Sequence, residues 1–370
     1  MRVLHVISDE NIGGAGVLLS NLLSELDPSR VHSTVALPAG SLLRERIAAQ
    51  GVPVLPLMHA SDRLSATAMH ELCRCIRQSR AQLVHANAAL SARVAGRICG
   101  IPVVHTRHCC YPLDGIWRLP PVRFAGGVCN RVLSDRVIAT ADAAAKNLCA
   151  LGIPQKKITV IINGSKPIRE VAEKELEDAR RALKIEKDDF CVGICARLEA
   201  CKGHDTFLRA ACLLRERAPK IRFRFLVVGT GTRGAELERL SHRLGIADAV
   251  RFTGFVTDMA PIYRLLRVNV NCSSGTETSC LALSEGMSAG VPCVVSDYGG
   301  NRAMIGDGAA GLLFPVGDFE ALAAHVLRIA TNPDIEVSMR RAARARYEQN
   351  YTARRMAEET TALYERMVKI

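Results

Sequence analysis

Two glutamates stand eight positions apart, at Glu277 and Glu285. The residues around them predict a helix from about Cys280 to Ala289, with Ser279 as its N-cap and Gly290 as its terminating glycine. Free N–H groups at such a helix start can bind phosphate, and a carboxylate within the helix can accept both hydroxyls of a ribose. Glutamate is most often a solvated surface residue. Glu285 instead lies among apolar and small residues, which favours a binding role.

Two cations five positions apart, Arg197 and Lys202, follow a predicted strand that ends at Cys195. Parallel sheets bind their ligands beside the carboxyl ends of their strands. There the two side chains would neutralise a diphosphate leaving group without a metal ion. Cations in loops are more often plain surface charges. The sequence leaves both interpretations open.

A glycine-rich turn, Gly13 to Gly16, separates the first predicted strand, Arg2 to Ser8, from an amphipathic helix. In a doubly wound sheet this turn is where the backbone can closely approach an anion. The spacing does not match G-x-G-x-x-G, and glycines at such turns also serve backbone freedom alone. By itself the turn predicts a strand followed by a helix and leaves anion binding open.

Apolar strands alternate with helix-like stretches along the chain, which predicts an α/β architecture with parallel sheets. After the first strand, the first series of expected strands is Ser33–Leu37, Val52–Leu57, Leu83–His85, Pro102–Thr106, Arg136–Thr140 and Ile158–Ile162. The second series is Phe190–Cys195, Phe223–Val228, Arg251–Gly254, Val268–Cys272, Pro292–Ser296 and Gly311–Phe314.

Turn residues at 163–167 and a polar stretch at 170–187 separate the two series, and we place the linker there. The expected domains are therefore residues 1–167 and 168–349, which fits a chain of 370 residues. The helix-rich end, about 350–370, is long enough to pack back onto the first domain.

The formal net charge is +12, and residues 1–168 hold 19 Lys and Arg against 10 Asp and Glu. A basic half favours phosphorylated ligands or an acidic lipid surface as partners. Aromatic residues make up only 4% and interleave with no basic run, which argues against nucleic acid. The sequence shows no signal peptide and no run of about 18 uncharged apolar residues, which predicts a cytoplasmic protein.

The 14 cysteines are scattered and often lie within predicted strands, so we expect reduced thiols. Cys73 and Cys75 form one close pair and Cys109 and Cys110 another, but neither meets a second Cys or His pair at zinc spacing. No metal site is expected, and no D-x-D sequence follows a strand to hold Mg²⁺.

The chain resembles the retaining GT-B glycosyltransferases of family 4 over nearly its whole length. The resemblance rests on the glycine turn, on ARLEACKGHD and VVGTGTRGAELERL, and on TETSCLALSEGMSAGVPCVVSDYGGNRAMIGDGAAGLLFPVGD. It implies two Rossmann-like, doubly wound domains that face a central cleft. It also implies a nucleotide-sugar donor, no cofactor and no required metal.

The resemblance implies a role for each matching residue. In the second domain, Arg197 and Lys202 would bind the donor diphosphate and Glu285 the ribose, while Glu277 would contact the transferred sugar. The remaining donor contacts there would come from the helix start at Cys280 and Leu281 and from Phe255 and Val256 beside the base. In the first domain, Gly14 and Gly16 would approach the diphosphate or the acceptor, and His108 would contact the donor sugar. His105 lies within an apolar strand and is expected to be structural.

By resemblance we expect transfer of a hexosyl or N-acetylhexosaminyl group, with a UDP-sugar favoured, to a saccharide or lipid-linked saccharide in cell-surface polysaccharide synthesis. The acceptor would meet the basic first domain, at the inner face of the plasma membrane. The charge could equally serve solubility alone. Two other classes share the fold, a nucleotide-sugar 2-epimerase and a catalytically silent partner subunit.

The chain departs from the family pattern at two places. Thr278, Ser279 and Cys280 replace the residues that usually follow the first glutamate, and Ala303 stands where a glutamate is common. Both departures make the donor sugar less predictable.

Overall fold

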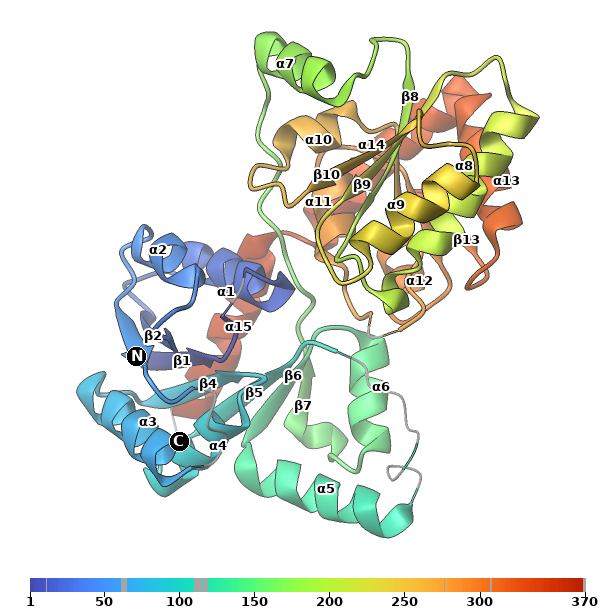
Figure 1. Ribbon diagram of the computed structural model, residues 1–370. Helices are drawn as coiled ribbons and strands as arrows, with labels where there is room; N and C mark the ends of the chain where they lie inside the picture. Colours follow the sequence, from blue (N-terminus) through green and yellow to red (C-terminus); the bar gives the residue numbers. More distant parts are fainter. Residues whose placement is uncertain are drawn as a thin grey trace. The chain divides into compact units, whose positions relative to one another are not determined.

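The computed structural model describes residues 1–10, 12–60, 65–109, 115, 119–275, 277–306 and 308–368. The chain divides into two compact units (Figure 1). The first comprises Met1–Ser165 together with Tyr351–Ile370, and the second comprises Lys166–Asn350. The expected division, after residue 167, lies two residues beyond the observed one. The end of the chain belongs to the first unit.

In the described part of the first unit, seven parallel strands form one sheet in the order β3-β2-β1-β4-β5-β6-β7. Strand order reverses between β1 and β4, where Val3 is in register with Leu83. The carboxyl ends of these two strands therefore mark the switch point of the sheet. The strands are β1 (Arg2–Ile7), β2 (His32–Pro38), β3 (Val54–Leu57), β4 (Leu83–Asn87), β5 (Val103–Arg107), β6 (Arg136–Ala139) and β7 (Ile158–Val160).

Helices cover both faces of this sheet (Figure 1). One core cluster joins the sheet to α1 and the closing helix α15, and a second joins the other face to α3 and α4. The helices of the unit are α1 (Gly14–Glu25), α2 (Leu43–Ala48), α3 (Ala66–Gln78), α4 (Leu90–Ile98), α5 (Pro120–Leu133), α6 (Asp142–Ala150) and α15 (Ala353–Val368).

The second unit repeats this plan in its described residues, with the strand order β10-β9-β8-β11-β12-β13. Its switch point lies between β8 and β11, which pair in parallel. The strands are β8 (Phe190–Cys195), β9 (Phe223–Val228), β10 (Val250–Gly254), β11 (Val268–Asn271), β12 (Cys293–Ser296) and β13 (Gly311–Phe314). The helices are α7 (Glu173–Leu183), α8 (His204–Arg217), α9 (Gly234–Arg243), α10 (Ala260–Leu265), α11 (Leu281–Ser288), α12 (Asn301–Ile305), α13 (Phe319–Ala330) and α14 (Pro333–Asn350).

The α/β fold with two doubly wound sheets confirms the sequence prediction, but the linker was drawn too long. Most of the polar stretch at 170–187 forms α7, which begins with Glu173 and Glu175 and ends with Arg180 and Arg181. This charge order suits the helix dipole. The helix also contributes Leu176 to the core cluster shared with α10. A polar stretch with apolar residues at helical spacing thus became a packed helix.

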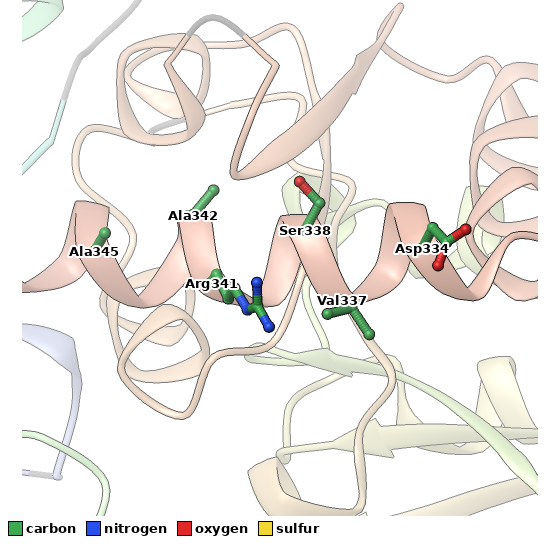
Figure 2. Close-up of a pocket in the computed structure, with 6 residues that line it drawn as sticks. All are labelled: Asp334, Val337, Ser338, Arg341, Ala342 and Ala345. Atoms are coloured by element: carbon green, nitrogen blue, oxygen red, sulfur yellow. The ribbon is translucent and has the colours of Figure 1, made fainter.

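A hollow of about 600 Å³ runs along α14 (Figure 2). Its lining comes from a single helix face: Asp334, Val337, Ser338, Arg341, Ala342 and Ala345. None of the residues singled out by the sequence lines it, so it does not bear on the candidate site. In the described part of the chain, no helix combines the length and apolarity needed to cross a membrane.

Candidate active site

The loops after β8 and β11 bring two of the predicted residues together at the switch point of the second unit. Lys202 ends a short 3-10 helix, and Gly203 follows it with a left-handed backbone (φ 68°). A Cβ on Gly203 would lie 2.2 Å from the carbonyl oxygen of Cys272, just beyond the end of β11. Only glycine allows this close approach. It sets Lys202 against the segment that carries Glu277.

Lys202 and Glu277 form a buried ion pair, with 2.8 Å between Nζ and Oε2. Their side chains are 16% and 9% exposed. Burial lowers the pKa of Lys202, but the facing carboxylate together with the nearby Cys280 and Cys201 leaves the pKa above its ordinary value. Burial likewise raises the pKa of Glu277, and the ammonium with two further hydrogen bonds brings it below the ordinary value. Both side chains are therefore charged at neutral pH.

Three donors converge on one oxygen of Glu277. Besides Lys202, the hydroxyl of Ser273 donates to Oε2 at 2.8 Å and the amide of Asn271 at 3.4 Å. No side chain of the described residues donates to Oε1. The carboxylate is thus anchored by Oε2, which leaves Oε1 able to accept a hydrogen bond from a ligand hydroxyl.

Glu285 lies within α11, half-buried, eight positions after Glu277. The hydroxyl of Tyr263 on α10 donates to Glu285 Oε2 at 3.0 Å and lies 3.1 Å from the carbonyl oxygen of Ala282. Burial raises the pKa of Tyr263 well above its ordinary value, so the hydroxyl keeps its proton. The sequence analysis did not single out this tyrosine, which holds the carboxylate in place.

The helix that carries Glu285 is shorter than predicted, and its predicted cap is wrong. Cys280, not Ser279, is the N-cap residue, and its side chain makes no capping hydrogen bond. The cysteine N–H instead donates to Met304 Sδ. A helix start without a side-chain cap has amide groups to offer to an anion. The predicted end is confirmed: Gly290 has φ 71° and donates to the Met287 carbonyl, as in a Schellman motif.

Arg197 lies two residues after the end of β8. Its side chain is exposed, and no carboxylate of the described residues pairs with it. Phe255 directly follows β10 and is 57% exposed, an unusual position for a phenylalanine. Val256 beside it is half-buried against the core cluster of α10. Leu281 opens α11 and is also half-buried.

Three predicted residues lie in the first unit. Gly14 opens α1 at the sheet's switch point, and a Cβ there would meet nothing within 4 Å, so a ligand could approach its backbone. Gly16 has a packing role, because a Cβ would lie 2.5 Å from Cδ1 of Leu43. His108 follows β5, and burial lowers its pKa to about 4. It is neutral at pH 7.

Three further histidines are buried in the same sheet. Burial lowers the pKa of His5 to about 3 and holds those of His85 and His105 well below the ordinary value. His85 Nδ1 lies 2.5 Å from the hydroxyl of Tyr364 on α15, and its Nε2 lies 2.6 Å from Thr106 Oγ1. These contacts tie the closing helix to the sheet.

We expect the first unit to lose stability as the pH falls below about 6.5. An unfolded chain protonates its histidines there, whereas the fold keeps His5 neutral down to about pH 3. The unfolded state then binds more protons, so the free energy of unfolding falls as the pH falls. The loss is about 1.4 kcal/mol for each unit by which the histidine pKa differs between the unfolded and the folded state. Urea unfolding at pH 7.5 and pH 5 measures this. His5→Leu should flatten the dependence, and the exposed His242→Gln should not; equal slopes in both variants would contradict the account.

Among the described residues, no group of three or more His, Cys, Asp or Glu side chains could hold a metal ion. In the described part of the chain, Cys73, Cys75 and Cys109 take part in no disulfide, while Cys110 lies outside the described residues. A metal-free reaction stays a prediction.

Sequence reasoning missed the polar residues that surround the glutamates, namely Tyr263, Asn271, Ser273 and Asn301. Each is nearly or fully buried. A usable signal existed in Val-Asn-Val-Asn at 268–271, because asparagines are unusual in a buried parallel strand. The hydrogen-bond partners of these asparagines come from segments far apart in sequence, which the local pattern does not reveal.

Known proteins resemble this chain in sequence and in fold. The model of glycosyl transferases group 1 matches residues 189–332, and that of Glycosyltransferase Family 4 matches residues 12–167. A D-inositol 3-phosphate glycosyltransferase of Kribbella flavida is 30% identical over 76% of this chain and 70% of its own. The putative glycosyltransferase EpsD of Bacillus subtilis is 31% identical over 52% of this chain and 49% of its own.

Solved structures show the same fold at low sequence identity. HepE of Anabaena, solved in complex with UDP and glucose, superposes with a TM-score of 0.84 at 20% identity, covering 98% of this chain and 99% of its own. WaaG, a glycosyltransferase involved in lipopolysaccharide biosynthesis, gives 0.71 at 14% identity, covering 98% and 99%. The two doubly wound units together have the GT-B fold of these glycosyltransferases. The chain belongs to glycosyltransferase family 4.

Proposed function

We propose that this enzyme moves a hexosyl or N-acetylhexosaminyl group from a UDP-sugar to a saccharide or lipid-linked saccharide, with retention at the anomeric carbon. The observation that carries the proposal is the anchored Glu277 carboxylate with its open Oε1, eight positions before the tyrosine-held Glu285. Carboxylates placed in this way can accept hydrogen bonds from hydroxyl groups of the sugar and of the ribose. HepE, which shares the fold, was solved with UDP-glucose. The setting is cell-surface polysaccharide synthesis on the cytoplasmic side of the membrane.

In the proposed donor complex, Glu277 orients the sugar and Glu285 holds the ribose, while Phe255 and Val256 flank the base. Arg197, Lys202 and the amide at Leu281 hold the diphosphate, because the Cys280 N–H already donates to Met304 Sδ. An ammonium has three N–H donors, of which Lys202 gives one to Glu277. The same lysine can therefore hold a diphosphate oxygen without releasing the carboxylate. Gly14 and His108, in the first unit, are further proposed contacts to the donor or the acceptor.

In the proposed reaction, the bond between the anomeric carbon and the diphosphate oxygen breaks. The acceptor oxygen bonds to the same face of that carbon, and its proton passes to the departing diphosphate oxygen. The cations stabilise the negative charge that develops on the leaving group. No cofactor or metal ion takes part in this scheme.

A thermal-shift panel of UDP, GDP and ADP, with their sugar conjugates, tests the donor assignment. A ligand that binds only the folded state stabilises it by about 2.7 kcal/mol at a hundred times its dissociation constant. We expect the UDP series alone to raise the melting temperature, equally with and without EDTA. A shift that EDTA abolishes would contradict the metal-free scheme, and a shift with GDP or ADP alone would contradict the donor.

The acceptor side of the proposal includes contact with an anionic membrane, for which α5 offers a surface. Apolar side chains at helical spacing are exposed along it, including Phe124 (72%) and Val132. The helix contains no Asp or Glu and carries Arg123 and Arg131. Lys157 Nζ donates to the carbonyl of Arg131, so a further cation lies beside the helix end. Apolar residues among cations suit an acidic lipid surface.

We expect the protein to sediment with vesicles that contain phosphatidylglycerol and not with phosphatidylcholine alone. Phe124→Ser combined with Val132→Ser should lower the bound fraction severalfold, because both remove exposed apolar surface. Val337→Ser on α14, also an exposed valine, is the matched control. Equal vesicle binding by the double variant and the control would show that the basic charge acts without this helix. If the wild-type protein bound no vesicles, the basic charge would serve solubility alone.

A further inference from the structure

A fully buried asparagine lies behind the Glu277 carboxylate. Asn301 is the first residue of α12 and is 0% exposed. Its Nδ2 donates to Asn271 Oδ1 at 3.2 Å, to the Ser296 carbonyl at 3.1 Å and to Ser296 Oγ at 3.3 Å. Because its side chain is enclosed, it cannot itself touch a substrate.

The partners of the two asparagines fix which way each amide points. The carbonyl of Ser296 can only accept, so Asn301 must present Nδ2 to it. The backbone N–H of Ser273 can only donate, and it meets Asn271 Oδ1 at 2.9 Å. Asn271 therefore has only Nδ2 to offer Glu277. Asn301 donates to that same Oδ1 and reinforces the orientation.

A second route also joins Asn301 to the carboxylate. Ser296 Oγ, which lies beside Asn301, donates to the carbonyl of Ser273 at 2.7 Å. Ser273 in turn donates its hydroxyl to Glu277 Oε2 at 2.8 Å. Two of the three hydrogen bonds on Oε2 thus depend on groups that contact Asn301.

We propose that Asn301 is a positioning residue for the glycosyl transfer proposed above. Through Asn271 and through Ser296 with Ser273, it holds Oε2 of Glu277 against Lys202 and leaves Oε1 for the sugar. Without Asn301 the carboxylate keeps its lysine partner but loses its fixed direction. The residue acts on turnover and not on nucleotide binding, because the ribose and diphosphate contacts belong to other side chains.

Asn301→Leu keeps the side-chain size and removes the amide. We expect UDP release from a UDP-sugar to slow at least tenfold, with UDP affinity within twofold of wild type. The acidic limb of the kcat profile should move to higher pH, because Asn271 and Ser273 are no longer held in place to donate to the charged form of Glu277. Val326→Ala creates a cavity in the core beside α13 and is the control for lowered stability. It should leave kcat and the acidic limb of the kcat profile unchanged. A wild-type kcat and limb in Asn301→Leu would overturn the proposal.

A measurement without turnover separates this inference from the proposed function. The carboxyl pKa of Glu277, read by ¹³C NMR and assigned with Glu277→Gln, should rise in Asn301→Leu. An unchanged pKa would overturn the positioning role whatever the enzyme transfers. If wild type turned over no UDP-sugar, the proposed function would fail, and the NMR result would still decide the role of Asn301. Ser296→Ala removes only the route through Ser296 and Ser273, so it should raise the pKa of Glu277 by less. This variant replaces Asn301→Leu in the test if the leucine variant does not fold.

Discussion

Replacing Glu277 with glutamine lowers the rate of sugar transfer by about a hundred- to a thousandfold, the usual loss when one electrostatic contact to a transition state is removed. UDP binding stays within a few-fold of wild type, because the nucleotide is held by other side chains in the proposed complex. The glutamine keeps the shape of the side chain but loses the charge that pairs with Lys202. Steady-state kinetics and calorimetry with UDP measure the two quantities separately.

Stability controls are needed because the pair is buried. Glu277→Ala leaves an unpaired ammonium and is expected to cost about 3–5 kcal/mol of unfolding free energy. Lys202→Met combined with Glu277→Gln removes both charges and should recover most of that stability without recovering transfer. If the double variant were both stable and active, the pair would be structural. Loss of UDP binding in Glu277→Gln would also count against the sugar-orienting role.

Replacing Arg197 with alanine weakens UDP binding about ten- to a hundredfold and leaves uridine binding unchanged. A hydrogen bond to a charged group contributes about 1.5–3 kcal/mol, and each 1.4 kcal/mol is a factor of ten. The side chain is exposed and unpaired by any carboxylate in the described part of the chain, so its removal should not change the melting temperature. Calorimetric titration of both ligands into the variant measures the effect.

Arg209→Ala on α8 is the matched control, because Arg209 is likewise an exposed arginine of the second unit. Its affinity for UDP should equal that of wild type. An equal loss in both variants would mean that general positive charge, and not Arg197 itself, attracts the nucleotide. Equal affinity for UDP in Arg197→Ala and wild type would remove Arg197 from the diphosphate site.

The sequence predicted the sheets well because buried parallel strands read as apolar runs between turns. Phe190–Cys195, Phe223–Val228 and Gly311–Phe314 have the predicted bounds in the structure. Helix ends were harder. Ser279 has the right chemistry for a cap, yet the helix begins at Leu281 and Cys280 takes the cap position. Local propensity cannot reveal that the cysteine N–H meets a methionine sulfur 24 positions away.

The site was predictable in its charged residues and not in their partners. Arg197, Lys202, Glu277 and Glu285 stood out by type and spacing. That Lys202 pairs with Glu277 across 75 positions follows from the adjacency of β8 and β11, which only the folded sheet supplies. Long-range pairs of this kind leave no local pattern in one sequence. The same limit hid Asn301, whose importance lies entirely in what it contacts.

Product analysis by NMR tests the central claim most directly. The enzyme is incubated with ¹³C-labelled UDP-glucose or UDP-N-acetylglucosamine, with and without a panel of saccharide acceptors. We predict UDP together with a product whose anomeric carbon has the α configuration of the donor, formed far more slowly by Glu277→Gln. A β-configured product would contradict retention. A donor altered at its sugar with no acceptor present would mark an epimerase, and binding of UDP without any turnover would mark a silent subunit.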